Sequence, residues 1–486
     1  MKKSSFYGSL LTSLMILSGC AGFGGTTTGG TTSNNSTNKT PTTSSTSSEF
    51  KYTSELTGFD PAVKTEIVFW HTMNKDKLQP VLDNIIAEFN KTELGANITV
   101  KHEQIGGYDE VRNAVITNIG VGATPNLAYC YPDHVALYRD NRVVETLDSY
   151  ISDIQYGFTE EERLGFVDGF YNEGRTFGDN KMYSLPFVKS TEVLFYDKDF
   201  FAKEGLTVPT TWDEMWAVCK QIKDKYPEST PLGYDSEANW FITNAEQRGY
   251  GYTSASTKVG GTDVGVRGHF RFNNDGNKGF LTELKDYFTK GYFTTKTIFG
   301  NYTSNLYKGE GNARCYMVIG STGGATNQLR ADSETGITPL PQAAADKKAK
   351  DAAISQGPSI CMFNKDNPQV EIASWLFLKY LTTNVAAQSS FAEASGYIPV
   401  SEIAQESEEY KAYLAKAEGK TSSGITALSA QAAVAQSAWY FASPTFVGSS
   451  YARDAAGTLI VDVLSKNVPV ETALTNAVES CVSKLA

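Results

Sequence analysis

Residues 66–101 read EIVFWHTMNKDKLQPVLDNIIAEFNKTELGANITVK, and this stretch decides the fold class. Its first five residues form a short, mostly apolar run that predicts a buried strand. The next apolar residues recur at offsets of three and four, the spacing of one helix face: Leu78, Val81, Leu82, Ile85, Ile86 and Phe89. Ile98 and Val100 then alternate with polar residues, which predicts a second strand. The stretch therefore reads strand, helix, strand.

The same alternation continues immediately downstream. Val111, Val115 and Ile119 carry a second helical stripe, and the segment 125–129 begins a third strand. Strands that alternate with helices in this way form a parallel sheet covered by helices. The region after residue 65 is therefore predicted to be an α/β unit.

A second α/β unit is predicted further along the chain. Residues 193–196 and 316–319 have the apolar composition of strands, and 368–383 form an amphipathic helix. Thr211 and Glu214 have the spacing of a capping box, which predicts a helix start at that point. Two such units of comparable size predict a cleft between them, which is the usual place for a ligand.

The N-terminus has the pattern of a secretory signal. Lys2 and Lys3 precede the short, largely apolar segment 10–17, which is too short to cross a bilayer. The run ends in Leu-Ser-Gly-Cys at 17–20, which resembles the bacterial lipobox, where the cysteine is lipidated. We therefore expect residues 1–19 to be a signal peptide and Cys20 to carry a lipid anchor. An ordinary signal peptide that contains a cysteine is the alternative.

A tether is expected between the anchor and the folded body. Residues 24–48 are almost wholly Gly, Thr, Ser and Asn, so they have little apolar surface to bury. About 30 flexible residues span roughly 30 Å root-mean-square. Residues 20–60 are therefore predicted to be a lipidated cysteine followed by a disordered tether.

The composition of the body argues against several functions. A net charge of −11 and the absence of a basic stripe argue against nucleic acid as a partner. The four histidines, His71, His102, His134 and His269, lack metal-site spacing, and we expect neither a metal nor a cofactor. Five cysteines follow Cys20 at wide spacings, and most are expected to be buried thiols: Cys130, Cys219, Cys315, Cys361 and Cys481.

Five segments, in order, resemble one known family. They are FWHTM at 69–73, GATPN at 122–126, the stretch 185–199, PTTWDE at 209–214 and GYIPV at 396–400. In order and spacing they are similar to the extracellular solute-binding proteins (family 1) of carbohydrate-type ABC importers. The first segment is similar to that of glycerol-3-phosphate- and oligosaccharide-binding members.

The resemblance implies a two-lobe, periplasmic-binding-protein-like α/β fold of type II, with hinge-joined lobes around a central cleft. It implies a first lobe of 61–186 plus 337–384 and a second lobe of 187–336 plus 385–486. The implied function is the substrate-binding subunit of an ABC importer, which captures a sugar, oligosaccharide or glycerol phosphate by lobe closure. Its partners would be permease subunits, and the membrane would be contacted only through the lipid anchor on its outer face. We expect a monomer without catalytic residues.

The resemblance also implies a set of ligand contacts. A sugar binder needs flat aromatic rings and polar groups in a partly dried cleft. The positions that match the family are Tyr108, Asp133, Ser190, Trp240, Ser321, Gly323, Tyr397 and Arg453. Arg453 has a guanidinium that suits phosphate or a ring hydroxyl. The chain departs from the glycerol-3-phosphate-binding pattern at 237–239, where Glu-Ala-Asn replaces a tryptophan.

Two alternatives belong to other functional classes. An anchored extracellular carbohydrate-active hydrolase would need a pair of carboxylates, and 54 acidic residues always allow some pair to be chosen. The sequence has no Gly-x-Ser-x-Gly elbow. A ligand-binding sensor or adhesin with the same fold is the other alternative, because no motif marks a permease contact.

Overall fold

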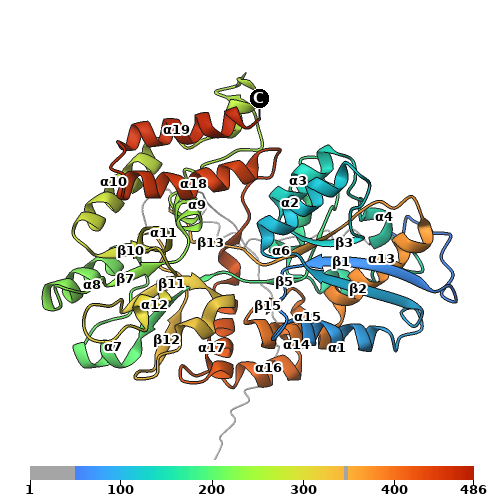
Figure 1. The fold of residues 1–486 in the computed structure, drawn as a ribbon, viewed down its shortest axis with the longest axis horizontal. Helices are drawn as coiled ribbons and strands as arrows, with labels where there is room; N and C mark the ends of the chain where they lie inside the picture. The colour runs from blue at the N-terminus through green and yellow to red at the C-terminus, as the bar shows by residue number, and fades with distance from the viewer. Residues whose placement is uncertain (1–49, 344–348, 486) are drawn as a thin grey trace, which may run out of the picture. The chain divides into compact units, whose positions relative to one another are not determined.

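The computed structural model describes residues 50–343 and 349–485. The predicted signal peptide, the lipidated Cys20 and most of the predicted tether lie outside these residues. In Figure 1 one sheet and its helices occupy the right of the view, and a second sheet and its helices occupy the left.

The first sheet contains the strands that open the chain. Its order is β2 (Ile98–Gln104), β1 (Thr65–His71), β3 (Leu127–Cys130), β14 (Ser359–Met362) and β4 (Leu185–Pro186). Strand β1 pairs in parallel with β2 and β3, as the strand–helix alternation predicts. Strand β14 is antiparallel to both β3 and β4. The sheet is therefore mixed rather than wholly parallel, because a strand from a distant segment is inserted into it.

Helices cover both faces of the first sheet. On one face, α1 (Gln79–Phe89) and α13 (Pro368–Thr383) pack on β1 around the fully buried Phe69 and Trp375. On the other face, α2 (Tyr108–Ile119) and α3 (Pro132–Asp140) pack around Val111 and Tyr138. Trp375 therefore belongs to the core of the first lobe.

The second sheet repeats this plan. Its order is β10 (Phe293–Thr295), β7 (Leu232–Tyr234), β11 (Met317–Ser321), β6 (Glu192–Asp197) and β12 (Thr335–Thr338). Strands β10, β7 and β11 pair in parallel, and β6 pairs antiparallel with both β11 and β12. Two mixed sheets, each with its own core, give the predicted two-lobe α/β architecture.

The helices of the second lobe are the main source of its core. They are α8 (Trp212–Lys225), α9 (Glu237–Gln247), α10 (Asp275–Thr289), α18 (Ser449–Leu464) and α19 (Val470–Ser483). The predicted capping box at the start of α8 is present: Thr211 Oγ accepts from the Glu214 amide, and the Glu214 carboxylate accepts from the Thr211 amide. Trp212 and Trp216 point from α8 into this core.

Three crossover segments join the lobes, and they hydrogen-bond to one another. Ser190 follows β5 (Val188–Lys189), and its backbone exchanges two hydrogen bonds of 2.8 Å with Gln356. Strand β13 (Ala353–Ile354) lies in parallel with β16 (Tyr440–Phe441). Gly357 packs at this point with φ +93°, and a Cβ there would lie 2.5 Å from the Val188 carbonyl oxygen. The crossovers therefore touch backbone to backbone.

The packing corrects one predicted lobe boundary. The resemblance implies that residues 385–486 belong to the second lobe, yet α14 (Val385–Ser395) and α16 (Glu408–Leu414) pack into the first core. Helix α17 (Ser422–Ala435) contributes Ala427 to the first core and Ile425 to the outer face of the second sheet. The reason is that α14 follows α13 after a sharp turn and packs beside it. The other predicted boundaries stay predictions.

The five cysteines of the described chain are buried and form no disulfide there, as expected of apolar thiols. Over the same residues, none of the helices combines the length and the apolar character needed to cross a bilayer.

Candidate ligand-binding cleft

A cavity of about 1010 Å³ opens between the two lobes, and we call it the outer cleft. From the first lobe it is lined by the starts of α2 and α3. From the second it is lined by the starts of α9 and α11 (Lys296–Phe299) and by most of the length of α18 (Ser449–Leu464).

A second, much smaller cavity of about 60 Å³ adjoins it, and we call it the inner pocket. Both cavities are lined by Tyr131, Asp133 and Arg453. The remaining walls of the inner pocket come from Pro132, from η1 (Glu173–Arg175), from Tyr252, from the crossover at 354–356 and from residues 442–449. Both lobes and two crossovers therefore meet at the inner pocket.

Three predicted contacts lie together at these cavities. Tyr108 is the first residue of α2 and lines the outer cleft, while Asp133 and Arg453 line both cavities. Tyr131 completes the group, because its ring centroid lies 4.6 Å from that of Tyr108. Burial raises the pKa of both tyrosines. Their hydroxyls therefore stay neutral and can both donate and accept.

Tyr397 lies behind Tyr108 rather than in the wall of either cavity. Its hydroxyl interacts with that of Tyr108, and burial raises its pKa. Gly323 packs against the Tyr397 ring so closely that a Cβ there would lie 2.3 Å from Cε1. Ser321 accepts a 3.2 Å hydrogen bond from the Gly323 amide. These three predicted contacts thus support Tyr108 in this conformation.

The last two predicted contacts lie elsewhere. Ser190 is in the first crossover, as predicted, but it is buried and lines neither cavity. Trp240 is fully buried in the second core, stacked on Tyr234 at a centroid distance of 4.4 Å. Trp240 therefore lines neither cavity in this structure, and its predicted contact with ligand stays a prediction. It lies one turn into α9 on the face that packs against the sheet and α8.

A buried polar network holds Arg453 in place. The guanidinium donates to the Asn239 side-chain oxygen, and Asn239 donates to Glu192 at 2.9 Å and to Gln356 at 3.0 Å. Tyr234 donates a 2.6 Å hydrogen bond to the other Glu192 oxygen. Asn239 is one of the three residues that stand where the glycerol-3-phosphate-binding pattern has a tryptophan. This departure therefore supplies a polar support for Arg453.

Glu192 makes stability depend on pH. Burial raises its pKa to about 7, although hydrogen bonds from Tyr234 and Asn239 oppose the shift. A carboxyl group with a raised pKa binds its proton more tightly in the folded state. Its contribution is therefore fully present below the unfolded pKa, near 4.5, and is lost as the pH rises through about 7. From pH 5 to pH 8 the loss should be about 2–3 kcal/mol.

Urea denaturation of the wild type and Glu192→Gln across this pH range should isolate the effect. The unfolding free energy of the wild type minus that of Glu192→Gln should fall as the pH rises. His71 requires this subtraction, since burial lowers its pKa to about 3 and its effect on stability runs in the opposite direction. A difference that does not change with pH would contradict a protonated Glu192.

The outer cleft carries more acid than base. Six carboxylates line it against four basic side chains: Asp109, Glu110, Asp133, Asp235, Glu237 and Asp454 against Arg112, Lys296, Arg453 and Lys466. Several of these charges are already engaged, such as Arg112 with Asp109 at 3.0 Å. A cleft of this balance suits a neutral or zwitterionic solute better than a doubly charged phosphomonoester.

Sequence reasoning missed five residues of the site. Tyr131 stands two residues before the predicted Asp133, so its position was a usable signal. The other four carry no local signal, because each reaches the site only through tertiary packing: Glu173, Asn239, Ser355 and Gln356. In the described part of the chain, no group of three or more His, Cys, Asp or Glu residues could hold a metal ion.

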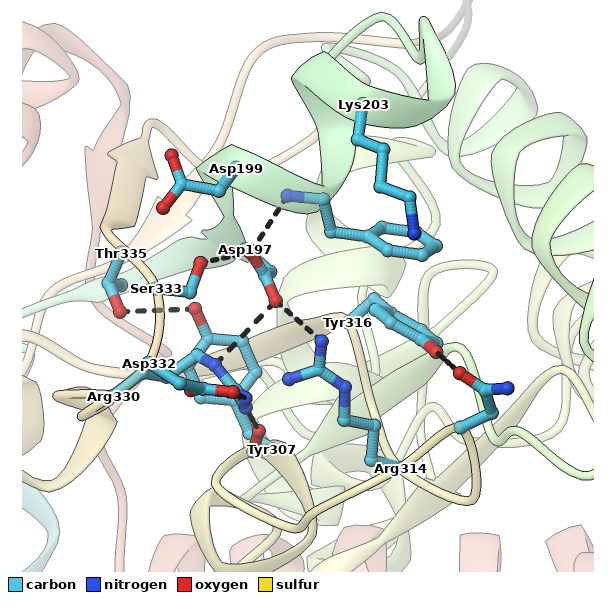
Figure 2. Close-up of polar contacts among 12 residues, drawn as sticks. Asp197, Asp199, Lys203, Tyr307, Arg314, Tyr316, Arg330, Asp332, Ser333 and Thr335 are labelled. Carbon is cyan, nitrogen blue, oxygen red and sulfur yellow. Dashed lines mark hydrogen bonds and ion pairs between the residues drawn. The ribbon is translucent and has the colours of Figure 1, made fainter.

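A second polar cluster lies at the opposite end of the second sheet (Figure 2). Asp197, which is buried, accepts hydrogen bonds from Arg314 at 2.8 Å and from the Phe200 amide at 3.0 Å. Arg330 lies 3.6 Å from the same carboxylate and forms an ion pair with Asp332. This cluster neutralises its own charges and ties the start of α7 (Lys198–Glu204) to the loop before β12. We assign it a structural role.

Two lobes, three crossovers and a cleft between them define the class of two-lobed α/β ligand-binding proteins. The chain belongs to the family of bacterial extracellular solute-binding proteins, whose family model matches residues 84–418.

Particular relatives fall within this class. The sn-glycerol-3-phosphate-binding periplasmic protein UgpB of Yersinia pestis bv. Antiqua is 27% identical over 350 residues, which cover 70% of this chain and 75% of that protein. Lmo0181 of Listeria monocytogenes, an ABC substrate-binding protein solved with cycloalternan, has a TM-score of 0.69 at 19% identity. The match covers 87% of this chain and 99% of that one.

UgpB of Mycobacterium tuberculosis, solved with glycerophosphocholine, has a TM-score of 0.68 at 16% identity. The match covers 86% of this chain and 99% of that one. These structural likenesses confirm the predicted two-lobe α/β fold.

Proposed function

We propose that this protein is the substrate-binding subunit of an ABC importer for a carbohydrate or glycerol-phosphate-type solute. The observation that carries the proposal is the outer cleft, where tyrosines and charged groups from both lobes face one space. Capture would need only hydrogen bonds, ring contacts and lobe closure about the crossovers, so we propose no catalysis. The relatives named above bind solutes of these two kinds.

The charge balance narrows the ligand within this proposal. Tyr108 and Tyr131 offer ring faces and hydroxyls, while the surplus of carboxylates in the outer cleft disfavours a free phosphomonoester. A neutral oligosaccharide or a zwitterionic glycerophosphodiester fits better. Arg453 would donate to a ring hydroxyl oxygen in the first case and to a phosphodiester oxygen in the second.

The remaining expectations complete the proposal. The protein would act as a monomer anchored by Cys20 at the outer face of the membrane, and it would deliver its solute to permease subunits. The first lobe would comprise 61–186 and 337–384, together with the packed helices of 385–435. The second lobe would comprise 187–336 and the C-terminal segment. Anchoring can be tested by incorporation of labelled lipid, which Cys20→Ser should abolish.

A thermal-shift screen tests solute binding. A solute at 100 times its Kd should stabilise the folded form by about 2.7 kcal/mol through mass action. The panel is maltotriose, cycloalternan, glycerophosphocholine and glycerol-3-phosphate, and we expect the last to give the smallest shift. Arg453→Ala should lose the shift. Arg267→Ala should keep it, because Arg267 is exposed and pairs with Glu479 outside the cavities.

Other outcomes would contradict the proposal. Absence of any shift together with hydrolysis of a glycosidic substrate would favour the hydrolase. Binding without loss of solute uptake when the protein is deleted from its host would favour the sensor or adhesin.

A further inference from the structure

The inner pocket contains two polar atoms whose hydrogen-bonding capacity is unused. Glu173 is buried, with 4% of its surface exposed, and lines the pocket. Its Oε1 and the hydroxyl of Ser355 are inaccessible and have no hydrogen-bond partner among the described residues. A buried oxygen without a partner costs about 1–3 kcal/mol, and more when it is charged. Such atoms beside a cavity call for a partner, and a ligand group or a water in the pocket can supply it.

Lys189 explains how Glu173 is tolerated in this position. Its ammonium group forms a buried ion pair with Glu173 Oε2, and it lies 3.5 Å from the Gly357 carbonyl oxygen. The ion pair neutralises the carboxylate but uses only one of its two oxygens. Glu173 therefore faces the pocket as an acceptor whose charge is already balanced.

The groups around the pocket define what it can hold. Glu173 Oε1 and Asp133 are acceptors, and the Ser355 hydroxyl can donate or accept. A volume of about 60 Å³ suits a few heavy atoms, since a water needs about 10–15 Å³ on the same scale. Arg453 also lines the pocket, but two carboxylates outnumber it and disfavour an anionic phosphate, and a trimethylammonium group has no N–H to donate. A small hydroxyl-bearing group can donate to Glu173 Oε1 and accept from the Ser355 hydroxyl.

We propose that the inner pocket is a subsite for the hydroxymethyl end of the solute, held by Glu173 and Ser355. This inference rests on the proposed function and deepens it. Sugars and glycerophosphodiesters share a CH₂OH end, so one subsite serves either ligand while the outer cleft takes the remainder. Because Ser355 belongs to a crossover and Glu173 to the first lobe, the bound end group would also link the hinge to a lobe.

Calorimetric titration of two serine variants tests this subsite. Ser355→Ala removes only the unpartnered hydroxyl, and we expect it to weaken binding of maltotriose or glycerophosphocholine five- to tenfold. Ser184→Ala is the matched control, since the Ser184 hydroxyl is also buried without a partner in the described chain but lines neither cavity. Its affinity should stay within twofold of the wild type.

Glu173→Gln and a pair of matched probes give a second, independent measurement. The variant should weaken binding at least tenfold. The wild type should prefer glycerophosphocholine to phosphocholine, or maltotriose to its end-ring 6-deoxy analogue, and Ser355→Ala should narrow that preference.

The two proposals fail in different ways. Wild-type affinity in both Ser355→Ala and Glu173→Gln, with a probe that the wild type binds, would overturn the subsite and leave the proposed function standing. A wild type that binds none of the probes would overturn the proposed function and the subsite with it.

Discussion

Replacing Asp197 with alanine is expected to lower the free energy of unfolding by about 3–5 kcal/mol. Its carboxylate is the shared partner of Arg314 and Arg330, whose side chains are only 12% and 1% exposed. Removing one member of a buried ion pair leaves the other charge uncompensated, which costs about 3–5 kcal/mol. Asp197 also caps α7 through the Phe200 amide, and loss of a cap costs about 1 kcal/mol.

Urea denaturation followed by circular dichroism would measure this loss. Asp199→Ala is the matched control, because Asp199 is exposed on the first turn of the same helix and should cost less than about 1 kcal/mol. Asp197→Asn keeps an acceptor for the cap, so its loss of unfolding free energy should lie between those of Asp197→Ala and Asp199→Ala. Solute affinity should not change in any of them, since β6 runs antiparallel and places Asp197 at the end of the sheet away from the cleft. A loss below about 1 kcal/mol for Asp197→Ala would contradict the role of this cluster.

The regular elements could be predicted from the sequence because their signals are local. The apolar stripe from Leu78 to Phe89 predicted α1, and the Thr211–Glu214 spacing predicted the start of α8. Both depend on residues three or four positions apart, where helix geometry brings side chains together. The order of these elements was enough to predict two α/β lobes and a cleft.

The parts that could not be predicted depend on long-range contacts. Strand β14 joins the first sheet from a point far along the chain, and α14 packs into the first core although the resemblance placed it in the second lobe. The inner pocket draws Glu173, Ser355 and Arg453 from three distant segments. No spacing in the sequence encodes such a meeting, so of the residues that were missed only Tyr131, beside Asp133, was within reach of sequence reasoning.

Trp240 shows how a resemblance can place a residue near the cleft while the structure buries its side chain. The residue was predicted to contact ligand, and α9 does begin at the outer cleft, with Glu237 in its lining. Trp240 lies three residues after Glu237, about 4.5 Å further along the helix axis, where the sheet and α8 already cover the helix. Here Trp240 points into the second core, while Asn239 beside it supports Arg453.

Trp240→Ala is therefore expected to reduce stability by about 3–5 kcal/mol and to change solute affinity little. Its ring lies 4.4 Å from Tyr234 and 5.7 Å from Trp212 between centroids, and no part of it is exposed. Truncation removes these contacts and leaves a cavity between the sheet and α8 that the neighbouring rings can fill only in part. Trp240→Phe keeps an aromatic ring in the stack, so it should lose substantially less stability than Trp240→Ala.

Stability and affinity measured on the same variant distinguish the two roles of Trp240. A tryptophan in the cleft wall would lose affinity by tenfold or more on truncation, with a stability change below about 1 kcal/mol, because its ring would have been partly exposed. A core tryptophan gives the reverse pattern, provided that titrations are made where the variant is fully folded. Loss of affinity without loss of stability would return Trp240 to the cleft and would require a conformation in which α9 turns its buried face toward the solute.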